Sequence, residues 1–253
     1  MTKGLVVLLL AVLGMGVLGT AQTAVTPRTA DGVLLFDNQT GMTVTGINIL
    51  FEQDVDVDLA NVVVVGGGNV TTLDVEGRSV WIDVEVEPEG TLSLGLSSEY
   101  VGAQIKTAHW FASMEEKNKI ITLRLLKDFW NEGDLRTADE LVSPDFILHD
   151  VSLFGDIVGI EAYKGFLGVW TSAFPDFQIT VDQIFGDGDL VYFVSTASAT
   201  HTGPLGAIPA TGMPWKVNGI VVRRVVDGKI VETWQLNDML SLLMQIGLVP
   251  PLQ

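Results

Sequence analysis

The sequence VNGIVVRRVVDGKIVETWQLN spans residues 217–237 and holds two strand-like segments joined by a tight turn. Apolar residues alternate with other residues in both segments, and Asp227-Gly228 is a dipeptide typical of hairpin turns. Two further strand-like segments, residues 177–185 and 190–201, precede this hairpin and are themselves joined by a Gly-Asp turn. The sequence therefore predicts an antiparallel sheet in the last third of the chain.

Helices are predicted around this sheet. Ile121, Leu125 and Phe129 follow helical spacing within residues 114–131, and a second long helix is predicted over residues 159–174. Short helices are expected at 137–142 and 239–246. Helices first and a sheet afterwards indicate an α+β fold, with a curved antiparallel sheet, cone-shaped with its packed helices, around one apolar cavity.

The front of the chain has a different pattern. Residues 31–100 contain short period-two segments separated by Gly- and Asn-rich turns, which indicates a small all-β, sandwich-like domain. We therefore expect a small acidic all-β domain over residues 30–105 and a pocket domain over residues 114–253. Residues 101–113 are expected to be the passage between them.

The first residues have the pattern of a secretory signal peptide. Lys3 precedes an uncharged run from Gly4 to Gly19, and small residues follow as far as Ala21. We expect residues 1–21 to be a signal peptide and the protein to be exported, whether secreted, periplasmic or at the cell surface. The alternative is an uncleaved anchor, although the run is shorter than the roughly 20 residues that a spanning helix prefers.

Composition excludes several classes of function. The formal net charge of −17 opposes binding to phosphate backbones, so nucleic acid is excluded as a partner. The chain has no cysteine, which excludes disulfides, a thiolate nucleophile and thiolate metal sites. Its three histidines do not stand at metal-ligand spacings, so we expect no metal site.

Two stretches of the front domain place acidic residues at alternate positions, which puts each set on one face of a strand. Such oxygen-rich faces suit a Ca²⁺ site, or they are solvated faces that discourage aggregation of strand edges. The residues are Asp54, Asp56 and Asp58 in one stretch and Asp83, Glu85 and Glu87 in the other.

Several spaced motifs of the rear domain resemble those of the SnoaL-like polyketide and ester cyclases, and they occur in the same order. The resemblance covers about 140 residues, implies the nuclear-transport-factor-2-like fold, and leaves the front domain without a counterpart. The motifs are His149-Asp150, residues 174–176 (FPD), 200–203 (THTG), 209–212 (PATG), 227–234 (DGKIVETW) and 245–247 (QIG).

Candidate site residues come from strand parity and from this resemblance. Glu232, Trp234 and Asp238 share one face of the last predicted strand, so they would line the cavity if that face turns inward. The resemblance implies three catalytic residues and no cofactor: Asp238 as the acid/base, His201 to polarise a carbonyl, and His149 to help orient the substrate. His149 stands where the polyketide enzymes can carry an asparagine. Asp238 could instead cap the closing helix.

Two functions remain open from the sequence. The first is an enzyme that binds a small hydrophobic carbonyl or ester compound and performs cofactor-independent acid/base chemistry of the cyclase, isomerase or hydrolase type. The second is a non-catalytic ligand-binding or interaction module on the same fold. A homodimer through the rear domain is expected in either case, because dimers are common for this fold.

Overall fold

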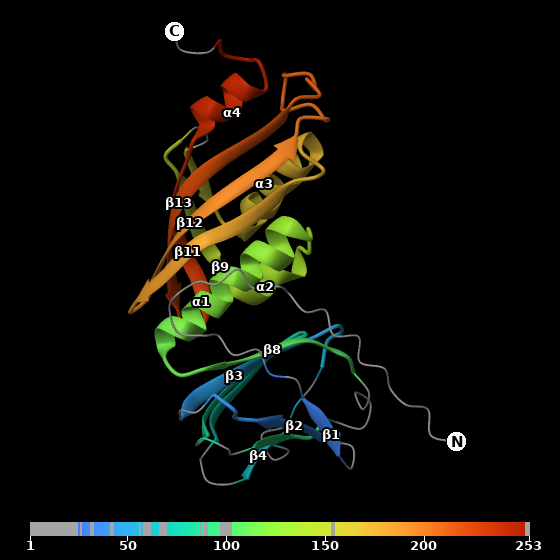
Figure 1. Ribbon diagram of the computed structural model, residues 1–253, viewed down its shortest axis with the longest axis vertical. Coiled ribbons are helices and arrows are strands. Elements are labelled where there is room, and N and C mark those ends of the chain that lie inside the picture. Colours follow the sequence, from blue (N-terminus) through green and yellow to red (C-terminus); the bar gives the residue numbers. More distant parts are fainter. Residues whose placement is uncertain are drawn as a thin grey trace, which may run out of the picture.

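The computed structural model describes residues 25, 27–30, 33–40, 43–55, 57, 62–65, 70–86, 88, 91–96, 103–152 and 155–250. Figure 1 shows two halves stacked along the long axis, with strands β1 to β8 in one half and the later elements in the other. The expected signal peptide, residues 1–21, lies outside the described residues. In the described part of the chain, no helix is both long and apolar enough to cross a membrane.

The described residues of the front half form eight strands in two four-stranded sheets, ordered β1-β2-β7-β4 and β5-β6-β3-β8. Buried side chains from both sheets, among them Phe36, Ile47, Ile82 and Leu92, form one hydrophobic cluster. The strands are β1 (Arg28–Ala30), β2 (Val33–Asp37), β3 (Val44–Phe51), β4 (Val62–Val65), β5 (Val70–Glu76), β6 (Ser79–Val86), β7 (Thr91–Leu94) and β8 (Ile105–Phe111).

Strand β8 corrects the expected passage between the domains. It pairs antiparallel with β3 from Gly46 to Phe51, so residues 105–111 belong to the front sheet. Ala108 and Trp110 point into the front core, whereas Phe111 belongs to the core of the rear half. The period-two alternation of this strand is interrupted by an irregularity in its pairing near Phe51, and this obscured the pattern in the sequence.

The rear half contains one six-stranded sheet with the order β10-β9-β14-β13-β12-β11. All of its pairs are antiparallel except β14 with β9, which is parallel, so the expected purely antiparallel sheet is in fact mixed. The strands are β9 (Val142–Asp150), β10 (Gly155–Val158), β11 (Gln178–Asp187), β12 (Leu190–Thr200), β13 (Pro214–Val226) and β14 (Lys229–Asn237). The helices are α1 (Met114–Arg124), η3 (Leu125–Asn131), α2 (Arg136–Leu141), α3 (Ile160–Ala173) and α4 (Met239–Gln245).

The helix predicted over residues 114–131 is present, but its second half is a π-helix. Ser113 caps the α-helical part, because its hydroxyl accepts a hydrogen bond from the backbone N–H of Glu116 at 3.3 Å. The wider i→i+5 pattern then begins at Leu125 and continues to Asn131. Such segments occur frequently at functional sites, and this one supplies Leu126 and Trp130 to the pocket described below.

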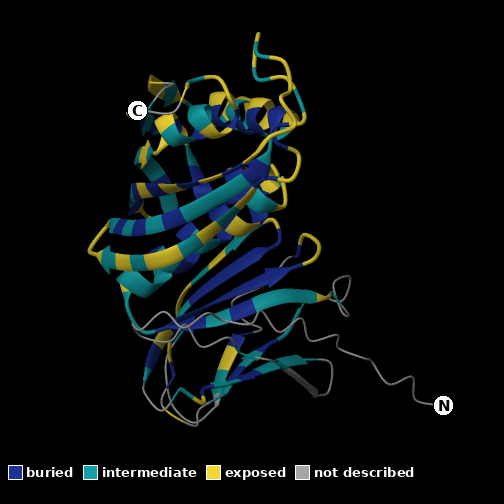
Figure 2. Cartoon of the chain, turned by 45° about the horizontal axis from the view of Figure 1, so that its top comes forward, coloured by how far each residue is buried: buried dark blue, intermediate teal, exposed yellow. Residues whose placement is uncertain are grey.

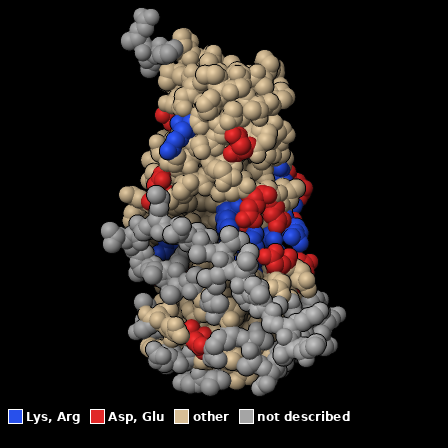
Figure 3. Space-filling model, turned by 45° about the vertical axis from the view of Figure 1, so that its right-hand side comes forward, with Lys and Arg blue, Asp and Glu red and all other residues tan. Residues whose placement is uncertain are grey.

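Buried charges join the two halves. Arg78, in the β5–β6 turn, and Arg124, on α1, both bind the carboxylate of Glu140, at 3.1 and 2.7 Å respectively. Lys106 on β8 binds Asp128 on the π-helix at 3.0 Å. Figure 3 shows charged side chains gathered around this junction, whereas the far part of the rear half carries few on the face in view. The junction is thus a built interface with its charges paired.

The acidic residues considered for Ca²⁺ do not gather in the described part of the chain. Asp83 accepts hydrogen bonds from Thr72 at 2.6 Å and Lys117 at 2.8 Å, and Glu85 is exposed. Asp54 lies 3.9 Å from Arg136. Asp56, Asp58 and Glu87 lie outside the described residues.

Candidate functional site

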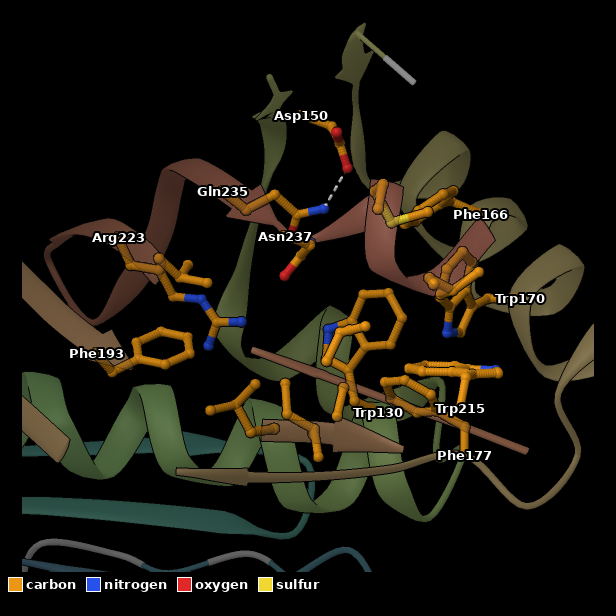
Figure 4. A pocket seen from close by; sticks show the side chains of 17 residues that line it. Trp130, Asp150, Phe166, Trp170, Phe177, Phe193, Trp215, Arg223, Gln235 and Asn237 are labelled. Atoms are coloured by element: carbon orange, nitrogen blue, oxygen red, sulfur yellow. Dashed lines mark hydrogen bonds between the residues drawn. The ribbon is translucent and has the colours of Figure 1, made fainter. Parts of the chain in front are cut away.

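A pocket lies between the six-stranded sheet and the helices η3, α3 and α4 (Figure 4). Aromatic rings form much of its wall and pack against one another edge-on or tilted, as aromatic pairs prefer. Figure 2 shows more buried and less buried positions alternating along the strands of the rear sheet, as on β13. The aromatic residues of the wall are Trp130, Phe166, Trp170, Phe177, Phe193 and Trp215.

Four polar side chains interrupt this apolar wall. Asp150, at the end of β9, is 4% exposed and accepts a hydrogen bond from the Gln235 amide at 2.6 Å, drawn as the dashed line in Figure 4. Its other carboxylate oxygen accepts from the backbone N–H of Ser152 at 2.8 Å. Asn237 and Arg223 also line the pocket. The pocket therefore presents a carboxylate, two amides and a guanidinium to whatever enters it.

Arg223 is buried among groups that do not neutralise its charge. Its side chain lies over the ring of Phe193 at 5.1 Å, and Nη1 donates to the carbonyl of Thr122 at 3.1 Å. Burial lowers the pKa of this guanidinium, while the nearby Tyr163 raises it. Among the described residues no carboxylate lies within 4 Å of it, and its Nε has no hydrogen-bond partner.

The structure turns the other face of β14 toward the pocket. Thr233, Gln235 and Asn237 point inward, whereas Glu232 and Trp234 lie on the outer face of the sheet and do not line the pocket. The predicted pocket position of these two residues is therefore corrected. The physical reason is a β-bulge: Arg224 pairs with Glu232 and the adjacent Val225 pairs with Ile230, so Val231 is an extra residue that reverses the alternation.

His149 also lies on the outer face, away from the pocket. Its ring stacks on Trp234 with centroids 5.6 Å apart, and its two nitrogens contact Asp156 at 2.9 Å and Glu232 at 3.0 Å. These hydrogen bonds raise the pKa of His149 above its usual value. Glu232 in turn binds Arg224 at 2.7 Å. The structure thus brings three of the predicted residues together, in an outer-face cluster.

His201 and Asp238 are separate from that cluster and from each other. His201 is fully buried, packs against Phe174 and contacts the Thr211 hydroxyl at 3.2 Å, without lining the pocket. Asp238 is exposed and caps α4, accepting hydrogen bonds from the Ser241 backbone at 3.0 Å and its hydroxyl at 2.6 Å. These bonds lower the pKa of Asp238. Its chain neighbours Asn237 and Met239 line the pocket, so Asp238 stands at the rim.

The pocket's polar residues had signals in the sequence. Phe146, Leu148 and Asp150 share one face of β9, so a carboxylate ends an apolar inward face. On β13 the inward face carries Val221, Arg223 and Val225, which places a cation within an apolar alternation. Core positions are normally apolar, so a charged residue at such a position is informative. On this ground the sequence marks Asp150 and Arg223 as candidate site residues.

Within the described residues no group of three or more His, Asp or Glu side chains is arranged to hold a metal ion. The site's polar groups are one carboxylate, one guanidinium and amides, a set suited to hydrogen bonding and proton transfer.

The mixed sheet covered by helices, with a pocket between them, defines an α+β pocket protein of the NTF2-like class. The family model for SnoaL-like polyketide cyclases matches residues 120–246, which is 127 of the 253 residues. The chain therefore belongs to the SnoaL-like polyketide cyclase family. The front half lies outside the matched range.

One solved structure supports this fold, and a second is similar in sequence. A protein from Jannaschia sp. CCS1, assigned to the SnoaL-like polyketide cyclases, superposes with a TM-score of 0.51 at 24% identity, covering 55% of this chain and 96% of its own. IdmH from Streptomyces antibioticus, a proposed polyketide cyclase, is 33% identical over 51% of this chain and 98% of its own, with a TM-score of 0.47. A comparison with curated proteins finds no match.

Proposed function

We propose that the rear half binds a small hydrophobic carbonyl or ester compound and performs acid/base chemistry on it without a cofactor, as a cyclase, isomerase or hydrolase. The observation that carries this proposal is Asp150, a buried carboxylate on the wall of an otherwise aromatic pocket. A carboxylate held beside a bound carbonyl compound can take the proton from the neighbouring carbon and return it after the bond change. The aromatic wall supplies binding energy through apolar burial.

Gln235 would position this carboxylate. Its amide donates to Oδ2 of Asp150, and the Ser152 backbone donates to Oδ1, so both oxygens are held in place. A base oriented by fixed donors needs little rearrangement during proton transfer.

The test is conversion of a compound in an extract of the source organism, followed by mass spectrometry with wild type and Asp150→Asn in parallel. We expect wild type to deplete a compound that the variant leaves unchanged, with a loss of about 10²-fold or more in rate. Asp182→Asn is the matched control, because Asp182 is an exposed carboxylate that accepts from Thr196 on β12. Equal conversion by wild type and Asp150→Asn would contradict the role of Asp150.

Asp238 is a second candidate for the same proton transfer, because it stands at the rim between two pocket residues. Asp238→Asn is a selective test, since asparagine is as good a helix N-cap as aspartate and the closing helix should stay intact. Loss of conversion in this variant but not in Asp150→Asn would assign the chemistry to Asp238. A compound retained unchanged by wild type and both variants would indicate a non-catalytic binding module.

We also propose that the protein forms a homodimer through the rear half. Large apolar side chains are exposed on the outer face of the sheet, among them Ile220 and Leu236, which are partners across β13 and β14, and exposed apolar patches mark interaction surfaces. Light scattering at micromolar concentration tests this, and a mass of one chain would contradict it. The residues include Val158 at 64% exposed, Ile220 at 57% and Leu236 at 55%.

Export through residues 1–21 is a further proposal, supported by the Lys3 start and the uncharged run that follows. N-terminal sequencing of the protein from culture medium or periplasm tests it, with Gln22 expected as the first residue. We further interpret the two front sheets as a small sandwich, because their buried faces share one cluster.

A further inference from the structure

Arg223 is a buried cation with no anionic partner within 4 Å among the described residues. Arg223 is 3% exposed, and among the described residues its guanidinium contacts the carbonyl of Thr122 and the face of Phe193, with the phenol of Tyr163 nearby. Removing a cation from water is costly unless an anion or several hydrogen bonds replace the lost hydration. A carbonyl and an aromatic ring supply only part of that. A site with this deficit is completed by an anionic or strongly accepting ligand.

The guanidinium faces the pocket. Arg223 lines it together with Asn237 and Trp215, and Figure 4 shows its nitrogen atoms directed into the space beside Asn237 and Trp130. The indole N–H of Trp215 also has no hydrogen-bond partner among the described residues. Trp215 lies eight residues before Arg223 on β13, at the other end of the pocket, so the two are separate buried donors of the pocket wall.

The position of Asp150 limits where an anion can bind. Asp150 lines the same pocket but lies more than 4 Å from Arg223, beyond the amides of Gln235 and Asn237. A second negative group beside Asp150 would be repelled, whereas the same group beside Arg223 would be attracted. The pocket is thus polarised, with an anion-binding end and a proton-transfer end.

We propose that Arg223 binds an acidic oxygen of the ligand, a carboxylate or an enolate, and that the ligand's hydrophobic ring lies against the aromatic wall. This inference rests on the proposed function and deepens it by naming the substrate class as a planar hydrophobic acid or enolised carbonyl compound. Charge-assisted hydrogen bonds from Arg to such oxygens are short and strong, and the planar guanidinium suits two oxygens at once.

The test uses benzoate and 2-naphthoate, each compared with its neutral amide, benzamide or 2-naphthamide, by calorimetric titration of the full protein at pH 7. Each carboxylate has the ring of its amide and differs in charge, so the comparison isolates the acidic oxygen. We expect wild type to bind the carboxylates about 10-fold or more tighter than the amides. An affinity for the carboxylates no higher than for the amides, including no binding of either, would overturn the proposal.

Variants then place the effect at Arg223. Arg223→Met should remove the preference for the carboxylate, and Arg223→Lys should keep part of it. Arg224→Met is a matched control, because Arg224 is the next residue but lies on the outer face over Trp234 and bound to Glu232. A preference that persists in Arg223→Met, or one that disappears in Arg224→Met alone, would overturn the assignment. The wild-type comparison needs no variant, so it holds even if Arg223→Met fails to fold.

The result of this binding experiment can be distinguished from the result of the conversion experiment on Asp150. Preferential carboxylate binding with full conversion by Asp150→Asn would keep the anion site and reject the acid/base role. Loss of conversion by Asp150→Asn with equal binding of carboxylates and amides would keep the acid/base role and reject the anion site.

Discussion

Glu140 is the residue on which the junction between the halves depends most. Its side chain is 8% exposed and each of its oxygens binds a different arginine, Arg78 from the front half and Arg124 from α1. Glu140→Gln would remove one carboxylate from each of two buried guanidinium groups, leaving Arg78 with Asp134 at 2.7 Å and Arg124 with Asp128 at 3.9 Å. Removing one partner of a buried ion pair typically costs about 3–5 kcal/mol, so we expect a loss of stability on that order in urea unfolding.

An exposed glutamate on α3 gives the comparison for Glu140. Glu161 binds Lys164 at 3.1 Å, but its side chain is 82% exposed, and exposed pairs contribute only about 0–1 kcal/mol. Glu161→Gln should therefore change the unfolding midpoint little. If the two variants lost similar stability, the buried network would not be the structural tie that its geometry indicates.

Histidines 149 and 109 should titrate on opposite sides of the ordinary histidine pKa of about 6.5. Hydrogen bonds to Asp156 and Glu232 raise the pKa of His149, while desolvation, with Lys127 and Arg124 nearby, lowers that of His109. His149 therefore adds stability below about pH 6.5 that is lost as pH rises through its folded pKa. For His109 the stability is present above about pH 6.5 and lost as pH falls.

Ring proton signals followed by NMR from pH 5 to 9 test this pair. The chain has three histidines, so His149→Gln and His109→Gln assign the signals directly. The wild type should also lose more stability than His149→Gln as pH rises above about 6.5. A midpoint for His149 at or below that of His109 would contradict the outer-face hydrogen bonds.

At the scale of elements, strand periodicity predicted the hairpin of β13 and β14 and its Asp227-Gly228 turn, because the turn residues and the alternation agree there. In β14 it grouped the side chains correctly but did not show which face turns inward, because the bulge at Val231 shifts the register between Ile230 and Glu232. Two of the family motifs fall on β9 and β14, and both strands supply pocket residues. Which side chains face the pocket depends on pairing register, which single-strand alternation does not encode.

Gly203 packs against the end of α3 and Gly168 lies within that helix. Adding a side chain is expected to have opposite effects on stability at the two positions. A Cβ at Gly203 would meet the backbone oxygen of Ser172 at 1.9 Å, so the loop after β12 can approach the end of α3 only with glycine. At Gly168 a Cβ would meet no atom of the described residues within 4 Å, apart from its chain neighbours and the backbone of its own helix. Gly203→Ala should therefore destabilise the protein, by about 1–3 kcal/mol as for overpacking, whereas Gly168→Ala should stabilise it by about 0.5–1 kcal/mol.

Thermal and urea unfolding of both glycine variants measure these signs. Gly165→Ala is a second control within the same helix, because its Cβ would also meet nothing within 4 Å. Stabilisation by Gly203→Ala, or destabilisation by Gly168→Ala, would show that the loop and helix do not pack as closely as the contact distance indicates.

At the scale of the whole molecule, the division into an acidic β-rich front and a pocket-forming rear followed from composition and periodicity. The close attachment of the two did not, because it depends on long-range contacts. Trp81 of β6 and Phe111 of β8 are front-half residues that belong to the rear half's core cluster. Nothing in their local sequence distinguishes them from Trp110, which points into the front core.

Because apolar and ionic contacts both cross the junction, the two halves should unfold together. Interfaces between domains permit independent motion unless they are large and hydrophobic, and this one buries two aromatic rings and the Glu140 network. Hydrogen exchange measured across a urea series should show β3 and β6 losing protection at the same concentration as β12 and β13.

A double variant, Trp81→Ala with Arg78→Ala, should separate that single transition into two. Truncating a buried aromatic ring costs about 3–5 kcal/mol, and Glu140 also loses one of its two arginines. Trp110→Ala is the matched control: it should weaken the front core without cutting the junction, and so lower the shared midpoint while keeping one transition. If the wild type already shows two transitions, the halves are thermodynamically independent. The front half could then not influence the pocket through η3, the π-helix whose Asp128 contacts Lys106 and Arg124.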